Sequence, residues 1–485
     1  MKFIVKLFPE ITIKSKPVRR RFIQRLQSNL QIILKRIDPE IGVSGKWDKV
    51  EVNVHSEDAA VHQAVIEALG DTPGINHFLQ VQEYPLGDFH QVFELTRDAF
   101  AAQLKGKRFV VRVKRAGKHD FTSSDLERYV GGGLLQHTEA AGVDLHHPEV
   151  TVKLEVRDQR LFLVENRFPG LGGFPMGSLE GVLSLISGGF DSTVSSYLTM
   201  KRGCKTHFCF FNLGGAAHET GVKQVSHYLW RRYSSSHRVK FVSVPFEGVV
   251  EEILKNVHHS QMGVVLKRMM MRAGEAVAER LGVDALVTGE SVAQVSSQTL
   301  PNLSLIDSVC NRLVLRPLVV SDKQDIIDTA RAIGTFDFAE TMPEYCGVIS
   351  DRPTTHARRE RIEEEESKFD NGVLEAAIAS AKVIRIDQIE QDAEAQVEVE
   401  TEQQVTAGEV IIDIRHPDEE EQAPLKVSGV EVIKIPFYSI GSRFAELDRQ
   451  RQYLLYCPKG VMSQLHALYL KDQGFGNVKV YRPSR

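Results

Sequence analysis

The stretch "LSLISGGFDSTVSSYL", residues 183–198, joins an apolar run to a glycine-rich turn and then to a helix-like pattern. Its central hexapeptide, Ser187–Ser192, sets two glycines and an aspartate between serines. Glycines let successive backbone N–H groups point at one anion, and the N-terminus of the next helix adds positive potential. No lysine follows the glycines, which argues against a Walker-type loop. The stretch predicts a phosphate-binding turn between a buried strand and a helix, with an ordinary strand–helix turn as the alternative.

Other short apolar runs follow the same turn and alternate with helical segments. The runs are "GVLSLIS", "CKTHFCFFNL", "RVKFVSVPF" and "ALVTGE". This alternation predicts a doubly wound parallel sheet. Within the turn, Asp191 is poorly placed to bind phosphate directly but well placed to hold a Mg²⁺ ion that does. Lys267, in a methionine-rich helical segment, could reach a phosphate, and a solvated helix lysine is the alternative.

The composition describes a soluble, multidomain chain. Its 485 residues are too many for one compact domain, so two to four are expected. No apolar run approaches the ~20 residues of a membrane span, and the start resembles a strand rather than a signal peptide. We therefore expect a cytoplasmic protein. Its five cysteines form no CxxC pair, which predicts neither a disulfide framework nor a structural metal site.

Charge is distributed unevenly along the chain. Residues 1–36 carry ten Lys or Arg and one acid, and residues 104–119 carry seven Lys or Arg and no acid. Residues 386–414 contain no basic residue and many carboxylates. A basic front and an acidic linker predict that a polyanion binds the N-terminal part. The basic residues singled out in the second block are Lys105, Lys107, Arg108, Arg112, Lys114, Arg115 and Lys118.

Two small α/β blocks are expected before the phosphate turn. Strand and helix patterns alternate over the first seventy residues or so, which is typical of a ferredoxin-like α+β domain. "RFVVRVKR", "TSSDLERYVGGGLLQHTEAAG" and "VTVKLEVRDQRLFLVENR" predict a second block whose basic side chains point outward from a strand.

Two cysteines are candidates for sulfur chemistry. Cys457, in "YLLYCPKGVMSQLHALYL", follows an apolar strand and precedes a helix. The loop Cys457–Ser463 can curl round the sulfur, so that backbone N–H groups and the helix N-terminus stabilise a thiolate or persulfide. Cys346, in the loop "TMPEYCGVIS", could close a disulfide with such a cysteine. A buried, inert thiol is the alternative for either residue.

These motifs resemble known families. The turn Ser187–Ser192 resembles the PP-loop of N-type ATP pyrophosphatases, which cleave ATP between the α- and β-phosphates and adenylate an oxygen. The loop at Cys457, with "DIR" at Asp413–Arg415, resembles a rhodanese sulfurtransferase domain. With the basic front, "RVKRAGKHDFTSSDLERYVGGG" included, the whole chain resembles the tRNA 4-thiouridine synthase family, sulfurtransferases also used in thiamine thiazole synthesis.

The resemblance implies a domain order. It gives a ferredoxin-like domain at 1–62, a THUMP RNA-binding domain at 63–167 and a Gly/Pro hinge at 168–177. A doubly wound, adenylating PP-loop domain follows at 178–395, then an acidic linker at 396–404 and a rhodanese-like α/β domain at 405–485.

The resemblance also assigns roles. Cys457 would carry the persulfide and Cys346 would be its disulfide partner, with Asp191 in the catalytic site. The residues implied in ATP binding are Leu185, Ile186, Ser187, Gly188, Gly189, Ser192, Lys267, Gly289 and Gln298. Mg-ATP would activate O4 of the uridine at position eight of a tRNA, and no protein metal centre is implied.

Three partners besides tRNA are implied: a cysteine desulfurase as sulfur donor, a small sulfur-carrier protein as alternative acceptor, and a cellular reductant that reopens the disulfide. Two other functions stay open from the residues alone. One is a PP-loop tRNA-modifying ligase that uses an amine nucleophile, and the other is a non-catalytic RNA-binding protein.

Overall fold

The computed structural model describes residues 1–45, 49–213, 215–340, 342 and 352–389. Toward the C-terminus it describes 400–406, 408–415, 420, 424–427, 429–435, 440–458, 463, 466–467, 470–471 and 473–483. The chain divides into two units, residues 1–178 with 201–203, and residues 179–200 with 204–485. None of the helices in these ranges is long and apolar enough to cross a membrane.

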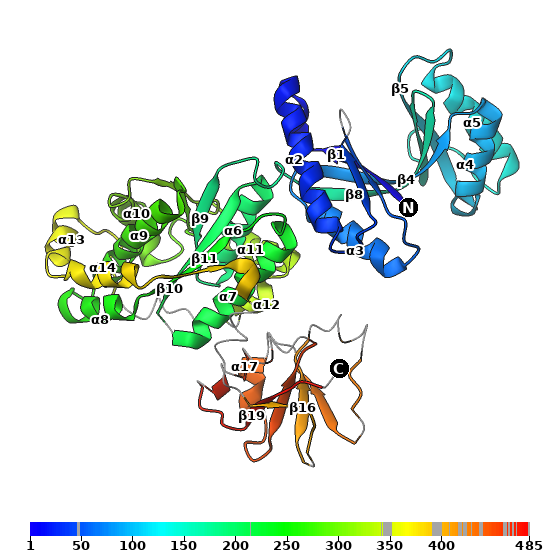
Figure 1. Cartoon of the computed structure of the whole chain (residues 1–485). Helices are drawn as coiled ribbons and strands as arrows, with labels where there is room; N and C mark the ends of the chain where they lie inside the picture. The colour runs from blue at the N-terminus through cyan, green and yellow to red at the C-terminus, as the bar shows by residue number, and fades with distance from the viewer. Residues whose placement is uncertain are drawn as a thin grey trace. The chain divides into compact units, whose positions relative to one another are not determined.

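The first unit is built on one eight-stranded sheet with the order β2-β3-β1-β4-β8-β7-β5-β6. Its two long strands, β4 and β8, pair antiparallel and join the regions expected as separate ferredoxin-like and THUMP domains (Figure 1). The strands are β1 (Lys2–Leu7), β2 (Gly42–Gly45), β3 (Lys49–Asn53), β4 (Ile75–Pro85), β5 (Arg108–Ala116), β6 (Gly142–Val143), β7 (Val150–Arg157) and β8 (Arg160–Gly172).

Helices cover this sheet in two groups. α2 and α3 pack on the β3, β4 and β8 part, and α4 and α5 pack on β5, β7 and β8. In α2, Leu26 and Leu30 are fully buried, as their four-residue spacing predicts. The bounds are α1 (Pro9–Thr12), α2 (Lys16–Leu34), α3 (Ala59–Gly70), α4 (Phe89–Leu104) and α5 (Ser123–His137).

The expected hinge at 168–177 is wrong in its first half. Residues 168–172 belong to β8 and pair with β4, with Phe168 opposite Phe78 and Pro169 opposite His77. β7 pairs with β8 only over residues 160–164. At Pro169, therefore, β8 is paired with β4 alone among the described strands, and its other edge has no neighbouring strand there to which a backbone N–H would donate. A proline, which has no N–H, is tolerated at such an edge position.

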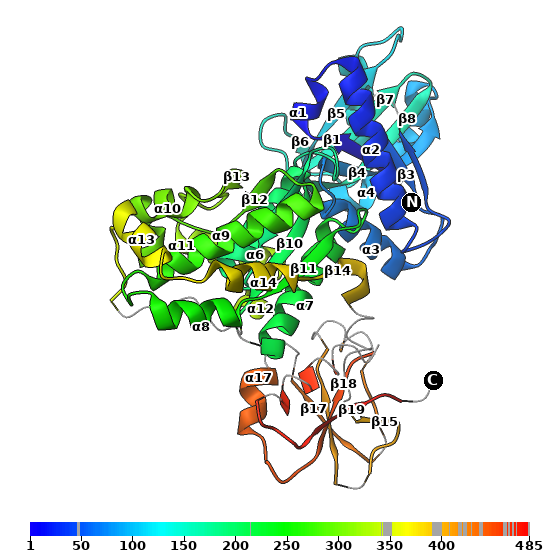
Figure 2. The ribbon, with the colours of Figure 1, turned by 60° about the vertical axis from the view of Figure 1, so that its left-hand side comes forward.

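The second unit contains the expected doubly wound sheet, with the order β13-β12-β9-β10-β11-β14 (Figure 2). All neighbouring pairs are parallel except β11 with β14. The strands are β9 (Gly181–Leu185), β10 (Lys205–Asn212), β11 (Lys240–Pro245), β12 (Ala285–Val287), β13 (Leu313–Leu315) and β14 (Lys382–Arg385).

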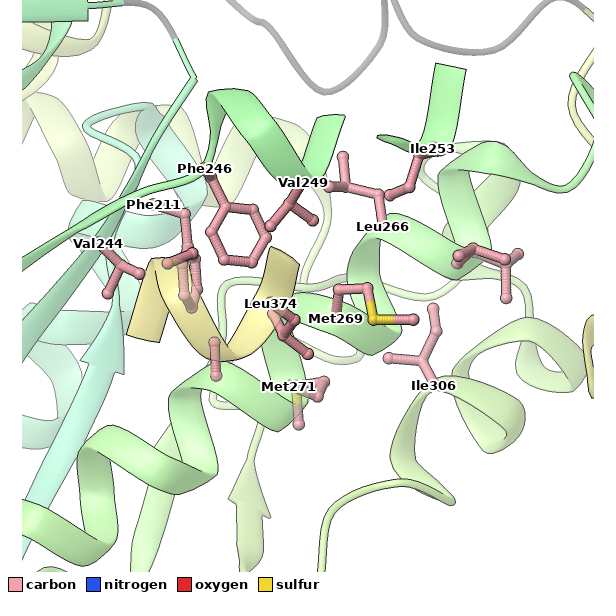
Figure 3. Close-up of a cluster of buried hydrophobic side chains, with 14 of the residues drawn as sticks. Phe211, Val244, Phe246, Val249, Ile253, Leu266, Met269, Met271, Ile306 and Leu374 are labelled. Atoms are coloured by element: carbon pink, nitrogen blue, oxygen red, sulfur yellow. The ribbon is translucent and has the colours of Figure 1, made fainter. Parts of the chain in front are cut away.

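Alternation along the strands supplies both faces of this sheet with apolar side chains. Cys209 and Phe211 of β10 belong to a core formed with α8, α9 and α14, and Phe210 meets His218 of α7 on the opposite face. Figure 3 shows the first core, in which Met269 and Met271 of α9 lie near Leu374 of α14. The helices are α6 (Phe190–Arg202), α7 (Gly215–Tyr233), α8 (Glu247–Asn256), α9 (Met262–Leu281), α10 (Leu300–Asp307), α11 (Lys323–Ile333), α12 (Phe336–Glu340), α13 (Arg359–Glu366) and α14 (Asn371–Ala379), with 3₁₀ turns η1 (Ser296–Gln298) and η2 (Ile386–Gln388).

The C-terminal residues form a five-stranded, wholly parallel sheet with the order β15-β19-β18-β16-β17. The elements are β15 (Thr401–Glu402), β16 (Val410–Asp413), β17 (Glu431–Lys434), α17 (Ile440–Arg443), η3 (Phe444–Glu446), β18 (Tyr453–Tyr456) and β19 (Val478–Tyr481). β15 pairs with β19 although it lies in the stretch expected as linker, whose residues 396–399 are outside the described ranges. The division into domains otherwise stays a prediction.

Candidate functional site

The phosphate turn lies where the order of the parallel sheet reverses. From β9 the chain moves to β10 and β11 on one side, and then returns to β12 and β13 on the other. The segments that follow β9 and β12 therefore leave adjacent strands at the same edge. In open α/β sheets this switch point at the carboxyl ends is the usual ligand-binding crevice.

The backbone of the turn requires a glycine at position 188. Gly188 has a φ of +87°, a conformation that side chains disfavour, and a Cβ there would lie 3.1 Å from Met342 and Val222. The Ser192 hydroxyl accepts from the Ser187 amide at 3.2 Å and donates to the Gly189 carbonyl at 3.1 Å. The loop is thus fixed by its own serines at the N-terminus of α6, where backbone N–H groups favour an anion.

Gly289 brings the end of β12 against this turn. A Cβ on Gly289 would lie 2.5 Å from the carbonyl carbon of Asp191 and 2.7 Å from the amide nitrogen of Ser192. These are backbone atoms, which cannot rotate away as a flexible side chain could. The structure therefore places Gly289 beside the first turn of α6, although the two segments are far apart in the sequence.

The carboxylate of Asp191 has two partners that the sequence did not reveal. Lys323, the first residue of α11, donates to Oδ1 at 2.8 Å, and Gln294 donates to Oδ2 at 2.7 Å. Both residues come from segments that leave the carboxyl ends of β12 and β13. Lys323 also lies 5.6 Å from the ring centre of Phe190, so its cation is held at the start of α6.

Lys267 projects from α9 to a buried acid rather than to bulk water. Its Nζ lies 2.9 Å from Oε1 of Glu290, whose other oxygen accepts from Arg316 Nε at 2.8 Å. Burial raises the pKa of Glu290, but the cations Lys267 and Arg316 outweigh it and lower the pKa to about 2. Glu290 is therefore ionised at neutral pH, and the interpretation of Lys267 as a freely solvated lysine is wrong.

The remaining predicted nucleotide residues lie around the same edge. Ile186 is buried and its amide donates to the Cys209 carbonyl at 2.9 Å, while Leu185 packs on α9 near Gly274. Gln298 ends η1, and its Oε1 accepts from the Ser291 amide at 3.4 Å. Because Ser291 follows Glu290 directly, Gln298 lies close to the segment that follows β12.

The sulfur candidate Cys457 directly follows β18 and is 7% exposed. The Ser463 amide donates to its Sγ at 3.4 Å, and the Ser463 hydroxyl lies at the same distance. A backbone N–H thus reaches the sulfur. Residues 459–462 lie outside the described ranges, so the loop expected round the sulfur stays a prediction. Pro458 is exposed but the sulfur itself packs among core residues, so the site is more enclosed than an exposed turn.

Asp413 and Arg415 form a buried ion pair at the end of β16, with Arg415 Nε 2.9 Å from an oxygen of Asp413. β16 is paired with β18, and Arg415 lies 5.3 Å from the ring centre of Tyr456, the residue before Cys457. The pair therefore supports the strand that presents the cysteine. Cys346 lies outside the described residues. Within the described ranges, no group of three or more His, Cys, Asp or Glu side chains could hold a metal ion.

The basic residues of the first unit are distributed as the strand pattern predicts. Arg108, Arg112 and Lys114 are exposed on β5, and the intervening Phe109, Val111 and Val113 are buried. Most of the others are exposed too, but Arg115 is half-buried, 5.8 Å from the ring centre of Phe121. The exposed set is Lys105, Lys107, Arg108, Arg112, Lys114 and Lys118. Their contacts with RNA stay a prediction.

Comparisons with known proteins connect these sites. Residues 177–371 match the family model "Thiamine biosynthesis protein (ThiI)", residues 87–164 match the THUMP domain, and residues 2–78 match the ThiI ferredoxin-like domain. A tRNA sulfurtransferase of Pseudomonas putida is 58% identical over 484 residues, covering 100% of both chains. One from Azotobacter vinelandii has the same identity and coverage. The chain belongs to the tRNA sulfurtransferase family.

A solved structure agrees with this membership of the tRNA sulfurtransferase family. A crystal structure of a 4-thiouridine synthetase–RNA complex with bound ATP has a TM-score of 0.68 and 26% identity. The alignment covers 79% of this chain and 99% of that one. The expected multidomain α/β architecture, with ferredoxin-like, THUMP and PP-loop parts, is thereby confirmed, while a rhodanese-like role for the C-terminal sheet stays a prediction.

Proposed function

We propose that this chain is an ATP-dependent tRNA uracil 4-sulfurtransferase that converts the uridine at position eight into 4-thiouridine. The observation that carries the proposal is the presence, on one chain, of a phosphate turn with paired lysines and of a cysteine whose sulfur accepts a backbone N–H. Family membership over the full length supports it. An amine-using ligase or a simple RNA-binding protein would have no use for the second feature.

The turn fits the phosphates of ATP. Gly188 adopts a conformation that side chains disfavour, and Gly289 leaves no room for one beside α6, so backbone N–H groups can approach an anion closely. Leu185 and Ile186 would line the base pocket, and Lys267 would reach a phosphate. Mg²⁺ would be held by Asp191 and phosphate oxygens, the usual ligand set for this ion, and would neutralise charge on the departing pyrophosphate.

In the first step, O4 of the uridine attacks the α-phosphorus, and the bond to the β-phosphate oxygen breaks, releasing pyrophosphate. The chain's contribution is a set of donors for the phosphates: the N–H groups at the N-terminus of α6, and the ammonium groups of Lys323 and Lys267, which Asp191 and Glu290 hold in place. The adenylated O4 is then a leaving group.

In the second step, the terminal sulfur of a persulfide on Cys457 attacks C4, and the C4–O4 bond breaks as AMP leaves. Cys346 then attacks Sγ of Cys457, so the transferred sulfur stays on C4 and a Cys346–Cys457 disulfide forms. A two-electron reductant restores both thiols, and a cysteine desulfurase reloads Cys457. The Ser463 N–H supports the proposed role of Cys457, because such a donor stabilises a sulfur anion.

The matched family model is described as a thiamine biosynthesis protein, which favours a second acceptor of sulfur besides tRNA. The C-terminal carboxylate of a small sulfur-carrier protein could be adenylated and thiolated by the same two steps, because it too presents an oxygen next to an electrophilic carbon. We expect one nucleotide site to serve both acceptors.

The test is Cys457→Ala, with 4-thiouridine measured in bulk tRNA from cells that depend on this protein. We expect thiolation to be lost while the purified variant still releases pyrophosphate from ATP when tRNA is present, because adenylation of O4 does not use Cys457. Cys310→Ser is the matched control, since Cys310 is half-buried and lies outside both sites. Undiminished thiolation in the Cys457 variant would refute the sulfur-carrier role.

A further inference from the structure

Glu290 is a buried acid that accepts three hydrogen bonds at the edge of the phosphate site, yet it was not among the predicted residues. It follows Gly289 at the end of β12 and is 7% exposed. Its Oε1 accepts from Lys267 at 2.9 Å, and its Oε2 accepts from Arg316 at 2.8 Å and from the Thr288 hydroxyl at 3.1 Å. Three donors, from α9 and from the segments that follow β12 and β13, thus meet on one carboxylate.

The two cations on Glu290 are not held equally. Arg316 is also anchored by Asp307, to which its Nη1 donates at 2.8 Å. Lys267 has Glu290 as its one hydrogen-bond partner among the described residues. An ammonium has three N–H donors, so those that Glu290 does not use remain for a ligand. Lys267 is thus fixed in place without being saturated.

We propose that Glu290 is a positioning residue of the adenylating site, which holds the Lys267 ammonium at the carboxyl end of β12 ready for the phosphates of ATP. This inference rests on the proposed function. A lysine side chain has four rotatable bonds and loses much freedom when it is fixed. Fixing it before ATP binds removes that cost from the reaction itself.

The competing explanation is that Glu290 only stabilises the fold, as buried ion pairs often do. A second acid, Glu366 of α13, offers a matched comparison because it also binds cations of α9. Glu366 bridges Arg268 at 2.6 Å and Arg272 at 2.8 Å, and Arg268 is the residue after Lys267. Glu366 is therefore also an acid between two cations, both of them on α9. Among the described residues, its hydrogen bonds and ion pairs involve none of the phosphate-site residues named above.

The test compares Glu290→Gln with Glu366→Gln in tRNA-dependent AMP formation. The amide keeps the volume of Glu290 but turns an N–H group toward one of its donors. We expect kcat to fall on the order of 10- to 100-fold, the usual effect of removing a group that orients a functional side chain. The KM for ATP should change less than about 3-fold, because Glu290 itself does not bind ATP. Glu366→Gln should leave both constants within about 2-fold.

A double-mutant cycle separates positioning from stability. If Glu290 acts through Lys267, then Glu290→Gln should cause little further loss in a Lys267→Ala background. The inference would be overturned if the kcat losses of the two single variants multiplied in the double variant. It would also be overturned if the kcat of Glu290→Gln lay within about 2-fold of wild type. If Glu290→Gln does not fold by circular dichroism, Glu290→Asp replaces it, since that variant keeps the charge but withdraws it from Lys267. A wild-type protein that forms no AMP with tRNA would instead refute the proposed function.

Discussion

Gly289 offers the sharpest test of the phosphate site, because a single methyl group should displace it. A Cβ at this position would lie 2.5 Å from the carbonyl carbon of Asp191, whereas ordinary contact begins at 3.4 Å. Gly289→Ala must therefore move the end of β12 or the start of α6 by about 0.9 Å. A misplacement of about 1 Å at a reacting centre can cost on the order of 100-fold in rate, equal to about 2.7 kcal/mol of barrier.

We expect Gly289→Ala to lower kcat/KM for tRNA-dependent AMP formation about 100-fold, and to destabilise the fold by about 1–3 kcal/mol through overpacking. The assay is release of labelled AMP from ATP, with unfolding in urea measured in parallel. Gly248→Ala is the control, because its Cβ in α8 would lie 3.6 Å from Val373, an ordinary contact. Near-normal AMP formation by the Gly289 variant would show that this close approach does not shape the site.

Three further results are expected. Lys323→Ala should reduce tRNA-dependent AMP formation at least about 10-fold. The unfolding midpoint should change little, because a part-exposed pair such as Lys323–Asp191 contributes at most about 1 kcal/mol to stability. A large loss of stability would contradict this prediction. The pKa of Glu290 is held at about 2 against an ordinary 4.5, so its stabilising effect is complete above about pH 5 and is lost as the pH falls from about 4.5 toward 2. The stability difference between wild type and Glu290→Gln should therefore shrink by about 1 kcal/mol between pH 6 and pH 4 in urea titrations, and a difference that grows would refute it. Arg415→Ala leaves Asp413 buried without that cation and should cost about 3–5 kcal/mol in the C-terminal sheet, abolishing thiolation while tRNA-dependent pyrophosphate release persists.

The parts of the fold that could be predicted from the sequence are those in which an uninterrupted apolar run marks a strand. β9, β10 and β11 were expected where they lie, because both faces of a parallel sheet are buried and the pattern is continuous. β4 was missed. Its neighbouring residues Phe78 and Leu79 are both buried, which breaks the two-residue alternation that indicates a strand.

α4 was missed for a different reason, since its signal was present. Asp88 accepts from the Gln91 amide at 2.8 Å, and the Gln91 side chain accepts from the Asp88 amide at 3.2 Å, which forms a capping box. The D-x-x-Q spacing before an apolar periodic segment marks such a helix start. This motif predicts α4 in the gap between the two N-terminal blocks.

The residues missed at the site share a physical feature: each is the partner of a residue that was found. Lys323 and Gln294 bind Asp191, and Glu290 binds Lys267, across separations of 132, 103 and 23 residues. Local sequence pattern shows that a turn can bind phosphate, but not which distant charge faces it. Only the strand order, which returns β12 and β13 to the free side of β9, brings these charges to one edge.

This pairing has a consequence for how the site treats its substrate. Both lysines offered to phosphate are already opposed by a carboxylate, Lys267 by Glu290 and Lys323 by Asp191. A site of unpaired cations would attract any polyanion, including tRNA itself, whereas these pairs keep the local charge near zero. The two acids then differ in role. Glu290 is buried and accepts three hydrogen bonds, so it holds Lys267 in place. Asp191 is partly exposed, so under the proposed function Mg²⁺ would bind its oxygens and leave Lys323 for the phosphates. Selectivity for Mg-ATP over other phosphates would follow from that exchange.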